Sequence, residues 1–243
     1  MAPEIHEGGD DRLLIICDHA SSHVPEDIDL GLESDDLDAM HIAVDVGARD
    51  VARLVAQAFD APAILATVSR LVIDLHREPD HPKLVPTESD GHAIPGNVGV
   101  DKAARIRRFY DPYHGAIADQ VAAHRPDLIV SIHSFTPQLA TSDEVRPWTV
   151  GILYNRDDRA ARFAIDWLRG QGIETGDNEP YSGKLLNATL NRHAEAHGIP
   201  YLAVEIVNDA ISDPGGIHHW ATKMEQMIVQ VRNSLASTGS PAT

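Results

Sequence analysis

The sequence has little cysteine, few aromatic residues and few basic residues. Its single cysteine, Cys17, cannot form an internal bridge, which excludes a fold held together by disulfides. Aromatic residues make up only 5% of the chain, so aliphatic side chains supply most of its 43% hydrophobic content. Lys and Arg number 20 against 37 Asp and Glu, which gives a formal net charge of −17. This scarcity of cations argues against a nucleic-acid partner, although it leaves room for a local basic pocket that binds a small anion.

Long apolar runs are also missing. The longest ones, such as Leu13–Cys17 and Leu71–Ile73, are far too short to span a bilayer, so we expect no membrane partner. The segment 1–11 is acidic and polar, and it shows no basic start followed by an apolar stretch, so we see no secretory signal. We therefore expect a soluble cytoplasmic protein.

The chain nevertheless contains enough apolar sequence for a sizeable core. Its 243 residues suit one large domain or two small ones. No internal repeat and no linker-like segment divides them, so we predict one domain over residues 1–243. We expect its core to extend from about residue 12 to about residue 235, with frayed ends at residues 1–10 and 236–243.

Short β-rich runs alternate with longer helical patterns, which predicts an α/β fold with a central mixed, mostly parallel sheet flanked by helices. The predicted strands are 13–17, 63–68, 71–75, 127–132, 149–153 and 201–206. The predicted helices are 45–59, 102–124, 159–170, 185–197 and 216–235. Pro112 predicts a kink or a break in the second of these helices. The Pro- and Gly-rich stretch 79–99 has no regular period, which indicates a functional or mobile loop.

Three of the predicted strands carry chemically active residues at or near their ends. Asp18 and His19 follow the first strand, His133 follows a central strand, and Glu205 lies inside a late apolar strand. Ligands of open α/β sheets gather beyond the carboxyl ends of the strands, and histidines with carboxylates are the usual inventory of a zinc hydrolase. The alternative is that each histidine is a hydrogen-bonded structural residue. A carboxylate such as Glu205, however, is almost never buried without a partner or a task.

Four segments, in a fixed order, carry a resemblance to a known family. They are Cys17-Asp-His-Ala-Ser-Ser-His-Val-Pro25, Ser69-Arg-Leu-Val-Ile-Asp-Leu-His-Arg77, Ser131-Ile-His-Ser-Phe135 and the strand that carries Glu205. Together they resemble the N-formylglutamate amidohydrolase family, whose members look like relatives of the zinc carboxypeptidases. The resemblance covers roughly residues 13–210. It implies a phosphorylase/hydrolase-like fold and one bound zinc ion.

The resemblance also implies roles for individual residues. His19 and His133 match the metal-binding histidines of the family, and Glu205 matches the position of the general base in the carboxypeptidases. Asp18, next to His19, is expected to orient a metal-binding histidine. This sequence has His76 where the family usually shows Asn, so its contacts with the substrate are expected to differ.

The third metal ligand is left open by the sequence. The His-x-x-Glu pattern of the carboxypeptidases is not kept, because Ser22 stands where the Glu would be. We expect Asp45 to be the third ligand, since related cell-wall amidases place a carboxylate at such a helix start. The alternatives are Ser22, Asp74 or a water molecule, and Asp45 would then be an N-terminal helix cap.

Arginines are expected to bind the carboxylates of an acidic substrate, because the planar guanidinium group matches a carboxylate. The candidates are Arg70, Arg77 and Arg192. In the alternative interpretation, Asp74 and one of these arginines form a buried structural pair, and Arg192 is a solvated residue on a helix face.

These observations lead to one expected function and two alternatives. We expect a zinc-dependent amidohydrolase that cleaves the N-formyl amide of an acidic amino acid such as N-formylglutamate, a small-molecule substrate. A second hydrolase hypothesis is cleavage of another N-acyl amino acid or a peptide-like amide. A hypothesis of another class is a non-catalytic homologue that binds a small ligand. The sequence does not indicate an oligomeric state.

Overall fold

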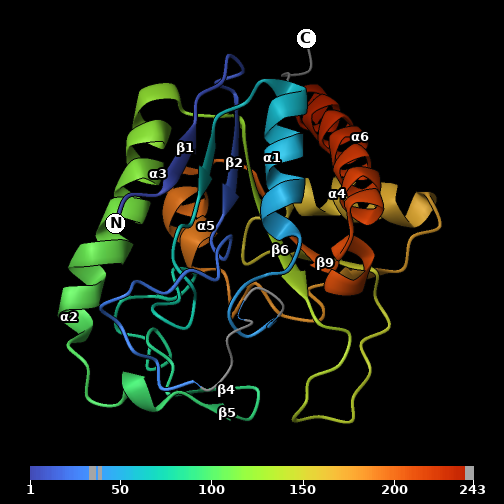
Figure 1. Cartoon of the computed structure of the whole chain (residues 1–243). Helices are drawn as coiled ribbons and strands as arrows, with labels where there is room; N and C mark the ends of the chain where they lie inside the picture. Colours follow the sequence, from blue (N-terminus) through green and yellow to red (C-terminus); the bar gives the residue numbers. More distant parts are fainter. Residues whose placement is uncertain (33–36, 38–39, 239–243) are drawn as a thin grey trace.

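The computed structural model describes residues 1–32, 37 and 40–238, and its centre is a sheet with helices on both faces (Figure 1). The strands of this sheet are β1 (Glu4–His6), β2 (Leu13–Cys17), β3 (Ala63–Leu65), β6 (Leu128–Phe135), β7 (Val150–Leu153), β8 (Thr175–Asp177) and β9 (Tyr201–Val207). Their order across the sheet is β1-β3-β2-β6-β9-β7-β8. The neighbours β3, β2, β6 and β9 are parallel, whereas β1 is antiparallel to β3 and β7 is antiparallel to β9. This mixed, mostly parallel sheet confirms the predicted fold class.

The central strands are buried along their whole length, because each is a nearly continuous apolar run covered on both faces. In the register of β2 and β6, Ile16 lies beside Ser131. In the register of β6 and β9, His133 lies beside Glu205. The carboxyl ends of these three strands therefore reach the same edge of the sheet, where their polar residues meet.

The helices divide between the two faces of the sheet. They are α1 (Ala48–Phe59), α2 (Lys102–Arg105), α3 (Asp111–His124), α4 (Arg159–Gly170), α5 (Ala188–His193) and α6 (Pro214–Thr238). Helix α6 packs against both α1 and α4, whereas α3 packs against α5 (Figure 1). None of the described helices combines the length and the apolar character that crossing a membrane requires.

The predicted strand 71–75 is wrong, because these residues form turns instead. Residues Leu71–Ile73 are buried, as the apolar run suggested, but their backbone does not join the sheet. The hydroxyl of Ser69 accepts from the backbone N–H of Leu71 (3.2 Å) and donates to the carbonyl of Ala43 (2.8 Å). A side chain that bonds its local backbone in this way favours a turn over a strand. The preceding strand is also shorter than predicted and ends at Leu65.

The predicted helix 102–124 continues past Pro112 without a break. A π-helical turn at Ile106–Tyr110 joins α2 to α3, and Pro112 falls in the first turn of α3. In the π-helical turn, the backbone N–H of Asp111 donates to the carbonyl of Ile106, five residues earlier. Proline lacks an N–H donor, and its cost is lowest at the start of a helix. The chain therefore accommodates Pro112 by a local change of pitch.

The predicted fraying of residues 1–10 is wrong at β1, which pairs with β3 at the edge of the sheet. The Glu4 carboxylate lies 2.6 Å from the Arg53 guanidinium and also pairs with Arg49. These ion pairs hold β1 in place together with its pairing to β3. At the other end, α6 continues to Thr238, and residues 239–243 lie outside the described part of the chain.

The stretch 79–99 contains a short hairpin, β4 (Glu88–Ser89) and β5 (His92–Ala93), and a 3-10 turn at Pro95–Asn97. Figure 1 shows this hairpin at the end of the molecule toward which the carboxyl ends of the central strands point. The irregular segment is thereby placed beside the polar residues that the strands deliver.

Candidate active site

Three buried side chains from three segments meet at the carboxyl edge of the sheet. His19 follows β2, His133 lies in β6, and Asp45 lies just before α1. Nδ1 of His133 is 2.9 Å from Oδ2 of Asp45, and Nδ1 of His19 is 3.3 Å from the same oxygen. All three residues are no more than 3% exposed. The structure therefore brings together the three residues predicted to bind metal.

The opposite ring nitrogen of each histidine faces another carboxylate. Nε2 of His19 lies 2.8 Å from Oδ1 of Asp74, and Nε2 of His133 lies 3.1 Å from Oδ2 of Asp18. The nearby carboxylates outweigh burial and raise the pKa of His19 and of His133. A metal ion would replace the proton on Nδ1 while Nε2–H still donates to its carboxylate. Asp18 thus orients His133 rather than its sequence neighbour His19, which Asp74 orients instead.

Asp45 is held in place by contacts other than helix capping. Its carboxylate accepts from Arg70 (3.0 Å) and from the backbone N–H of Ser134 (3.3 Å). Helix α1 begins after Gly47, whose cap position makes no side-chain hydrogen bond, so the capping interpretation of Asp45 is wrong. Burial alone would raise the pKa of Asp45, but His19, His133 and Arg70 outweigh burial and lower it.

Asp18 is the centre of a second buried hydrogen-bond network. Its carboxylate accepts from the hydroxyls of Thr189 (2.7 Å) and Ser131 (3.2 Å), and Nδ1 of His76 lies 3.2 Å away. His76 also approaches the Thr189 hydroxyl (3.1 Å), and its ring centroid is 4.8 Å from that of His133. The sequence singled out His76 only as a departure from the family, and it gave no signal for Thr189, which lies more than a hundred residues away in the chain.

Glu205 faces the same space from the neighbouring strand. It is 8% exposed and lies beside His133 in the register of β6 and β9. Burial is the main cause that raises the pKa of Glu205 to about 7, while the positive charges of His133 and Arg70 act in the opposite direction. A carboxylate with a pKa near neutrality can accept a proton and return it.

His19, Asp45, His133 and Glu205 line a cavity of about 140 Å³. Its wall consists of His19, His41, Asp45, Arg70, Asp74, His76, Arg77, His133, Ser134, Phe135, Thr136, Tyr181, Leu186 and Glu205. Tyr181 was not identified from the sequence, because it lies in an irregular segment between β8 and α5 with no motif around it. Its hydroxyl accepts from Arg146 (3.0 Å), and burial raises its pKa.

The structure separates the three predicted substrate-binding arginines. Arg70 and Arg77 line the cavity, and both contact Oδ2 of Asp74, at 3.2 and 3.3 Å. Arg192 is not part of the wall: it pairs with Glu78 (2.6 Å), and its guanidinium lies over the ring of Tyr110.

Comparison with known proteins identifies the family of the chain. A model of the N-formylglutamate amidohydrolase family matches residues 11–212. The chain belongs to this family. A comparison with curated protein sequences finds no match.

Solved structures share the fold of this family member along nearly its whole length. The crystal structure of gene product Atu2144 from Agrobacterium tumefaciens is 30% identical, covers 98% of this chain and 96% of its own, and superposes with a TM-score of 0.89. The N-formylglutamate amidohydrolase from Ralstonia eutropha JMP134 is 19% identical, with 96% and 97% coverage and a TM-score of 0.66. Membership of the family supports an amidohydrolase, and the second likeness shows the shared fold.

The donor set of this amidohydrolase family member fits a metal ion. Within the described residues, two groups have ligand atoms within 4.8 Å of one another: His19, Asp45 and His133, which are all buried, and Asp18, His76 and His133, of which His76 is only partly buried. Ligand atoms about 2 Å from a shared zinc ion lie roughly 3 Å apart, which is the spacing around Asp45 Oδ2. The second group has a similar spacing around Asp18 Oδ2 (3.1 and 3.2 Å), but Asp18 does not line the cavity that contains Glu205, whereas all three members of the first group do. The first group therefore fits a metal better.

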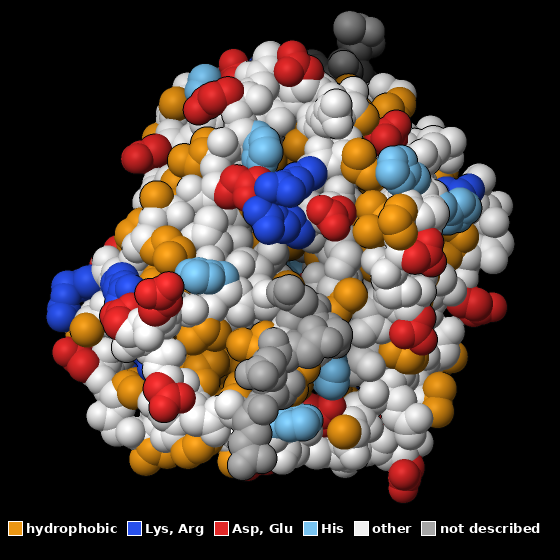
Figure 2. Space-filling view, in the orientation of Figure 1, with side chains coloured by type: hydrophobic (Ala, Val, Ile, Leu, Met, Phe, Trp, Pro, Cys, Tyr) orange, Lys and Arg blue, Asp and Glu red, His pale blue; other side chains and the backbone are white. Residues whose placement is uncertain are grey.

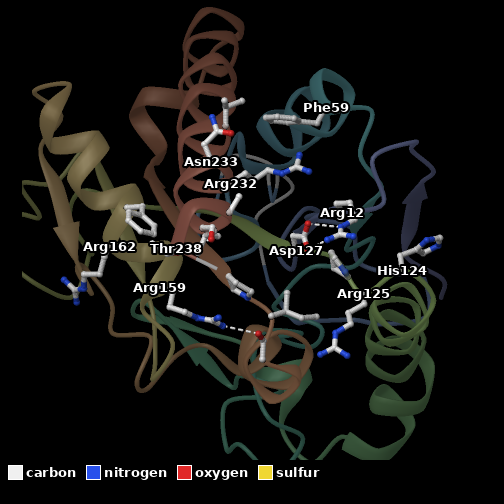
Figure 3. A pocket seen from close by; sticks show the side chains of 18 residues that line it. Arg12, Phe59, His124, Arg125, Asp127, Arg159, Arg162, Arg232, Asn233 and Thr238 are labelled. Atoms are coloured by element: carbon white, nitrogen blue, oxygen red, sulfur yellow. Dashed lines mark hydrogen bonds and ion pairs between the residues drawn. The ribbon is translucent and has the colours of Figure 1, made fainter. Parts of the chain in front are cut away.

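A larger cavity of about 1390 Å³ lies at the opposite end of the sheet, near the amino ends of β6 and β9 (Figure 3). It is rich in arginine, but most of these cations are paired: Arg12 with Asp127, Arg162 with Asp177, and Arg232 with Asp10. Helices α3 and α6 end there, and cations near helix C-termini are stabilising. None of the metal-binding candidates lines this cavity, so we place the active site at the other end.

The surface around the molecule is acidic, in agreement with the net charge of −17. Figure 2 shows Asp and Glu side chains spread over one face, with Lys and Arg gathered in a few places. Any attraction of an anionic substrate therefore has to come from cations inside the site rather than from the surface as a whole.

Proposed function

We propose that the protein is a zinc-dependent amidohydrolase that cleaves the N-acyl amide of an acidic amino acid such as N-formylglutamate. The observation that carries this proposal is the convergence of Nδ1 of His19 and Nδ1 of His133 on one oxygen of Asp45, with Glu205 in the same cavity. This arrangement supplies a metal-binding set and a separate base, which hydrolysis of an amide by water requires.

His19, His133 and Asp45 would hold the zinc ion, with Asp74 and Asp18 fixing the orientation of the two imidazoles. When bound there, zinc would supply polarisation of the acyl carbonyl and would lower the pKa of a water molecule to about 7. The residues that orient the ligands are buried, so the imidazole rings have little freedom to turn away from the site.

Glu205 would act as the general base. Its carboxylate accepts a proton from the attacking water and later donates one to the nitrogen of the leaving amine, which leaves Glu205 ionised again. Its buried position next to His133 supports this role, because a carboxylate with a raised pKa transfers a proton in both directions near neutral pH.

The arginines of the wall would favour an acidic substrate. Arg70 uses its terminal nitrogens on Asp45 and Asp74, whereas Arg77 contacts Asp74 through Nε. Among the described residues, the two terminal nitrogens of Arg77 have no hydrogen-bond partner, which leaves them available for a carboxylate. Arg192 pairs with Glu78 outside the cavity wall, so we assign it no contact with the substrate.

The test is hydrolysis of N-formylglutamate by the zinc-loaded protein, by the fully chelated protein and by the Glu205→Gln variant. We expect activity only in the first, with full zinc content in the variant. Activity that survives chelation, or an unchanged rate in Glu205→Gln, contradicts the mechanism. A protein that binds no zinc would support the non-catalytic alternative instead.

His76 motivates the second hydrolase hypothesis, cleavage of another N-acyl amino acid, because it changes one wall of the cavity. Its imidazole lines the cavity where the family usually has the smaller Asn. A panel of N-formyl and N-acetyl amino acids separates the two hypotheses, because activity confined to acetylated or uncharged substrates would exclude N-formylglutamate.

A further inference from the structure

The candidate catalytic cavity adjoins a larger outer cavity. The outer cavity measures about 540 Å³, and three residues, Arg70, Asp74 and Arg77, line both spaces. Small-molecule sites are typically about 300–1,000 Å³. The inner cavity of about 140 Å³ is smaller than this range, whereas the outer cavity falls within it. The two spaces together have room for a substrate longer than one N-acyl amino acid.

The outer cavity has a preformed far wall. This wall comes from the segment 82–91, which includes β4, and from Thr141 in the loop after β6. The carboxylate of Asp90 joins the two segments, because it accepts from the backbone N–H groups of Ala140 (2.9 Å) and Thr141 (3.0 Å) and from the Thr141 hydroxyl (2.7 Å). The hydroxyls of Thr87 and Ser89 lie on residues of the same wall and are suited to hydrogen bonds with a peptide group.

Two uncommitted cations face this combined space. Arg77 stands at the junction of the two cavities, and Lys83 lines the outer one. The Lys83 ammonium has no partner among residues 1–32, 37 and 40–238. The backbone of Lys83 is held at this wall, because its N–H donates to Nδ1 of His81 (3.1 Å).

The number of free cations limits what the inner cavity can bind. Arg70 is committed to Asp45 and Asp74, so Arg77 is the cation of the wall with terminal nitrogens still available for one carboxylate. Free N-formylglutamate carries two carboxylates, whereas a glutamyl residue whose α-carboxyl is in a peptide bond keeps only its γ-carboxylate. The carboxylates of the second residue then need a cation in the outer cavity, and Lys83 lines that cavity.

On the basis of the proposed function, we propose that the outer cavity is a subsite for the second residue of an N-acylated acidic dipeptide. Arg77 pairs with the side-chain carboxylate of the first residue, and Lys83 pairs with a carboxylate of the second, called here the outer carboxylate. Glu88 lines the same outer space and is exposed, and it opposes a second carboxylate. The subsite therefore contains Lys83, which attracts the outer carboxylate, and Glu88, which repels it. Neutralising Lys83 should weaken binding of the dipeptide, whereas neutralising Glu88 should strengthen it.

The experiment measures binding by calorimetry in the zinc-loaded Glu205→Gln variant, so that no ligand is hydrolysed. The ligands are N-formylglutamate and N-formylglutamylglutamate. We expect the dipeptide to bind about fivefold more tightly, because this factor is the largest gain in affinity that one partly exposed ion pair usually gives. Lys83→Gln in the same background should bring the ratio of the two dissociation constants to about one, and Glu88→Gln should increase it about twofold.

Lys102→Gln is the matched control, because it removes the same charge from an exposed residue at the start of α2, away from both cavities. Its ratio of dissociation constants should equal that of the background. Equal binding of the two ligands, or a ratio that Lys83→Gln leaves unchanged, overturns the outer subsite while leaving the proposed function in place. Failure of both ligands to bind, with neither hydrolysed by the wild type, overturns the proposed function and the subsite together.

Discussion

His19 and Asp74 are joined by a 2.8 Å contact between Nε2 and Oδ1, and the other oxygen of Asp74 contacts both Arg70 and Arg77. One buried carboxylate therefore orients an imidazole proposed to bind metal and positions the two arginines of the cavity wall. In the proposed mechanism, metal binding and substrate binding would be linked through this side chain, because a movement of Asp74 would disturb both.

We expect Asp74→Asn to weaken zinc binding by about 10–100-fold, the usual cost of losing a residue that orients a metal ligand. The amide cannot accept from His19 and from both arginines as the carboxylate does. Competition with a chromophoric chelator measures the affinity. Asp80→Asn, an exposed neighbour, is the control, and circular dichroism checks that the variant is folded. An affinity equal to that of the wild type would show that Asp74 has only a structural role.

A second prediction concerns acid stability and rests on a buried histidine pair behind the site. Nδ1 of His114 lies 2.9 Å from Nε2 of His193, and Nε2 of His114 lies 2.9 Å from the carbonyl oxygen of Leu75. His114 therefore donates through Nε2 and accepts from His193 through Nδ1, so both rings are neutral. Burial is the main cause that lowers the pKa of His114 to about 3 and that of His193 to about 4.

Because both values lie below the ordinary histidine pKa of about 6.5, the unfolded chain binds these protons more readily than the folded one. The stability that the pair provides is full above about pH 6.5 and falls as the pH decreases toward 4. We expect His193→Asn, which keeps a donor for His114, to reduce the slope of unfolding free energy against pH by up to about 1.4 kcal/mol per unit between pH 6.5 and 5. Urea unfolding measures the slope.

The control for this prediction is His219→Asn, because His219 is an exposed histidine on α6. It should leave the slope unchanged. If the slope in His193→Asn equals that of the wild type, the buried pair does not contribute to acid sensitivity.

The sequence predicted the sheet well because its strands are buried, continuous apolar runs, as in β2 and β9. It failed at Leu71–Ile73, which is equally apolar and equally buried. The difference is local: the Ser69 hydroxyl satisfies the backbone of the turn, and an apolar pattern reports burial without reporting the hydrogen-bond partners of the backbone.

The candidate site could be predicted where its residues belong to sequence motifs in a strand or directly after one. His133 and Glu205 lie in β6 and β9, and His19 lies just after β2. The orienting carboxylates were harder to assign, because Asp18 bonds to His133 across the sheet and not to the adjacent His19. Tyr181 and Thr189 reach the site from irregular or distant segments, and such contacts exist only once the chain has folded.

A third prediction concerns Asp90, which joins the β4–β5 turn to the loop after β6. Its carboxylate accepts from Thr141 and Ala140, and it lies 2.9 Å from Nε2 of His41. We expect Asp90→Asn to destabilise this junction by about 1–2 kcal/mol, because several hydrogen bonds to a charged acceptor are lost. Limited proteolysis should then cut the loop 136–147 faster, whereas an unchanged cleavage rate would mean that the junction is held by other contacts.

The last prediction concerns His76 and the size of the acyl group. Its ring lies between the Asp18–Thr189 network and the cavity, with its centroid 4.8 Å from that of His133. We expect His76→Asn to enlarge the space beside the metal-binding set without removing a ligand from it. The ratio of kcat/KM for N-acetylglutamate to that for N-formylglutamate should rise about tenfold, the lower end of what one additional methylene is worth in an enzyme pocket. Zinc content measured on the same samples should not change. A loss of zinc would instead place His76 among the metal ligands, and an unchanged ratio would show that the acyl group binds on another side of the cavity.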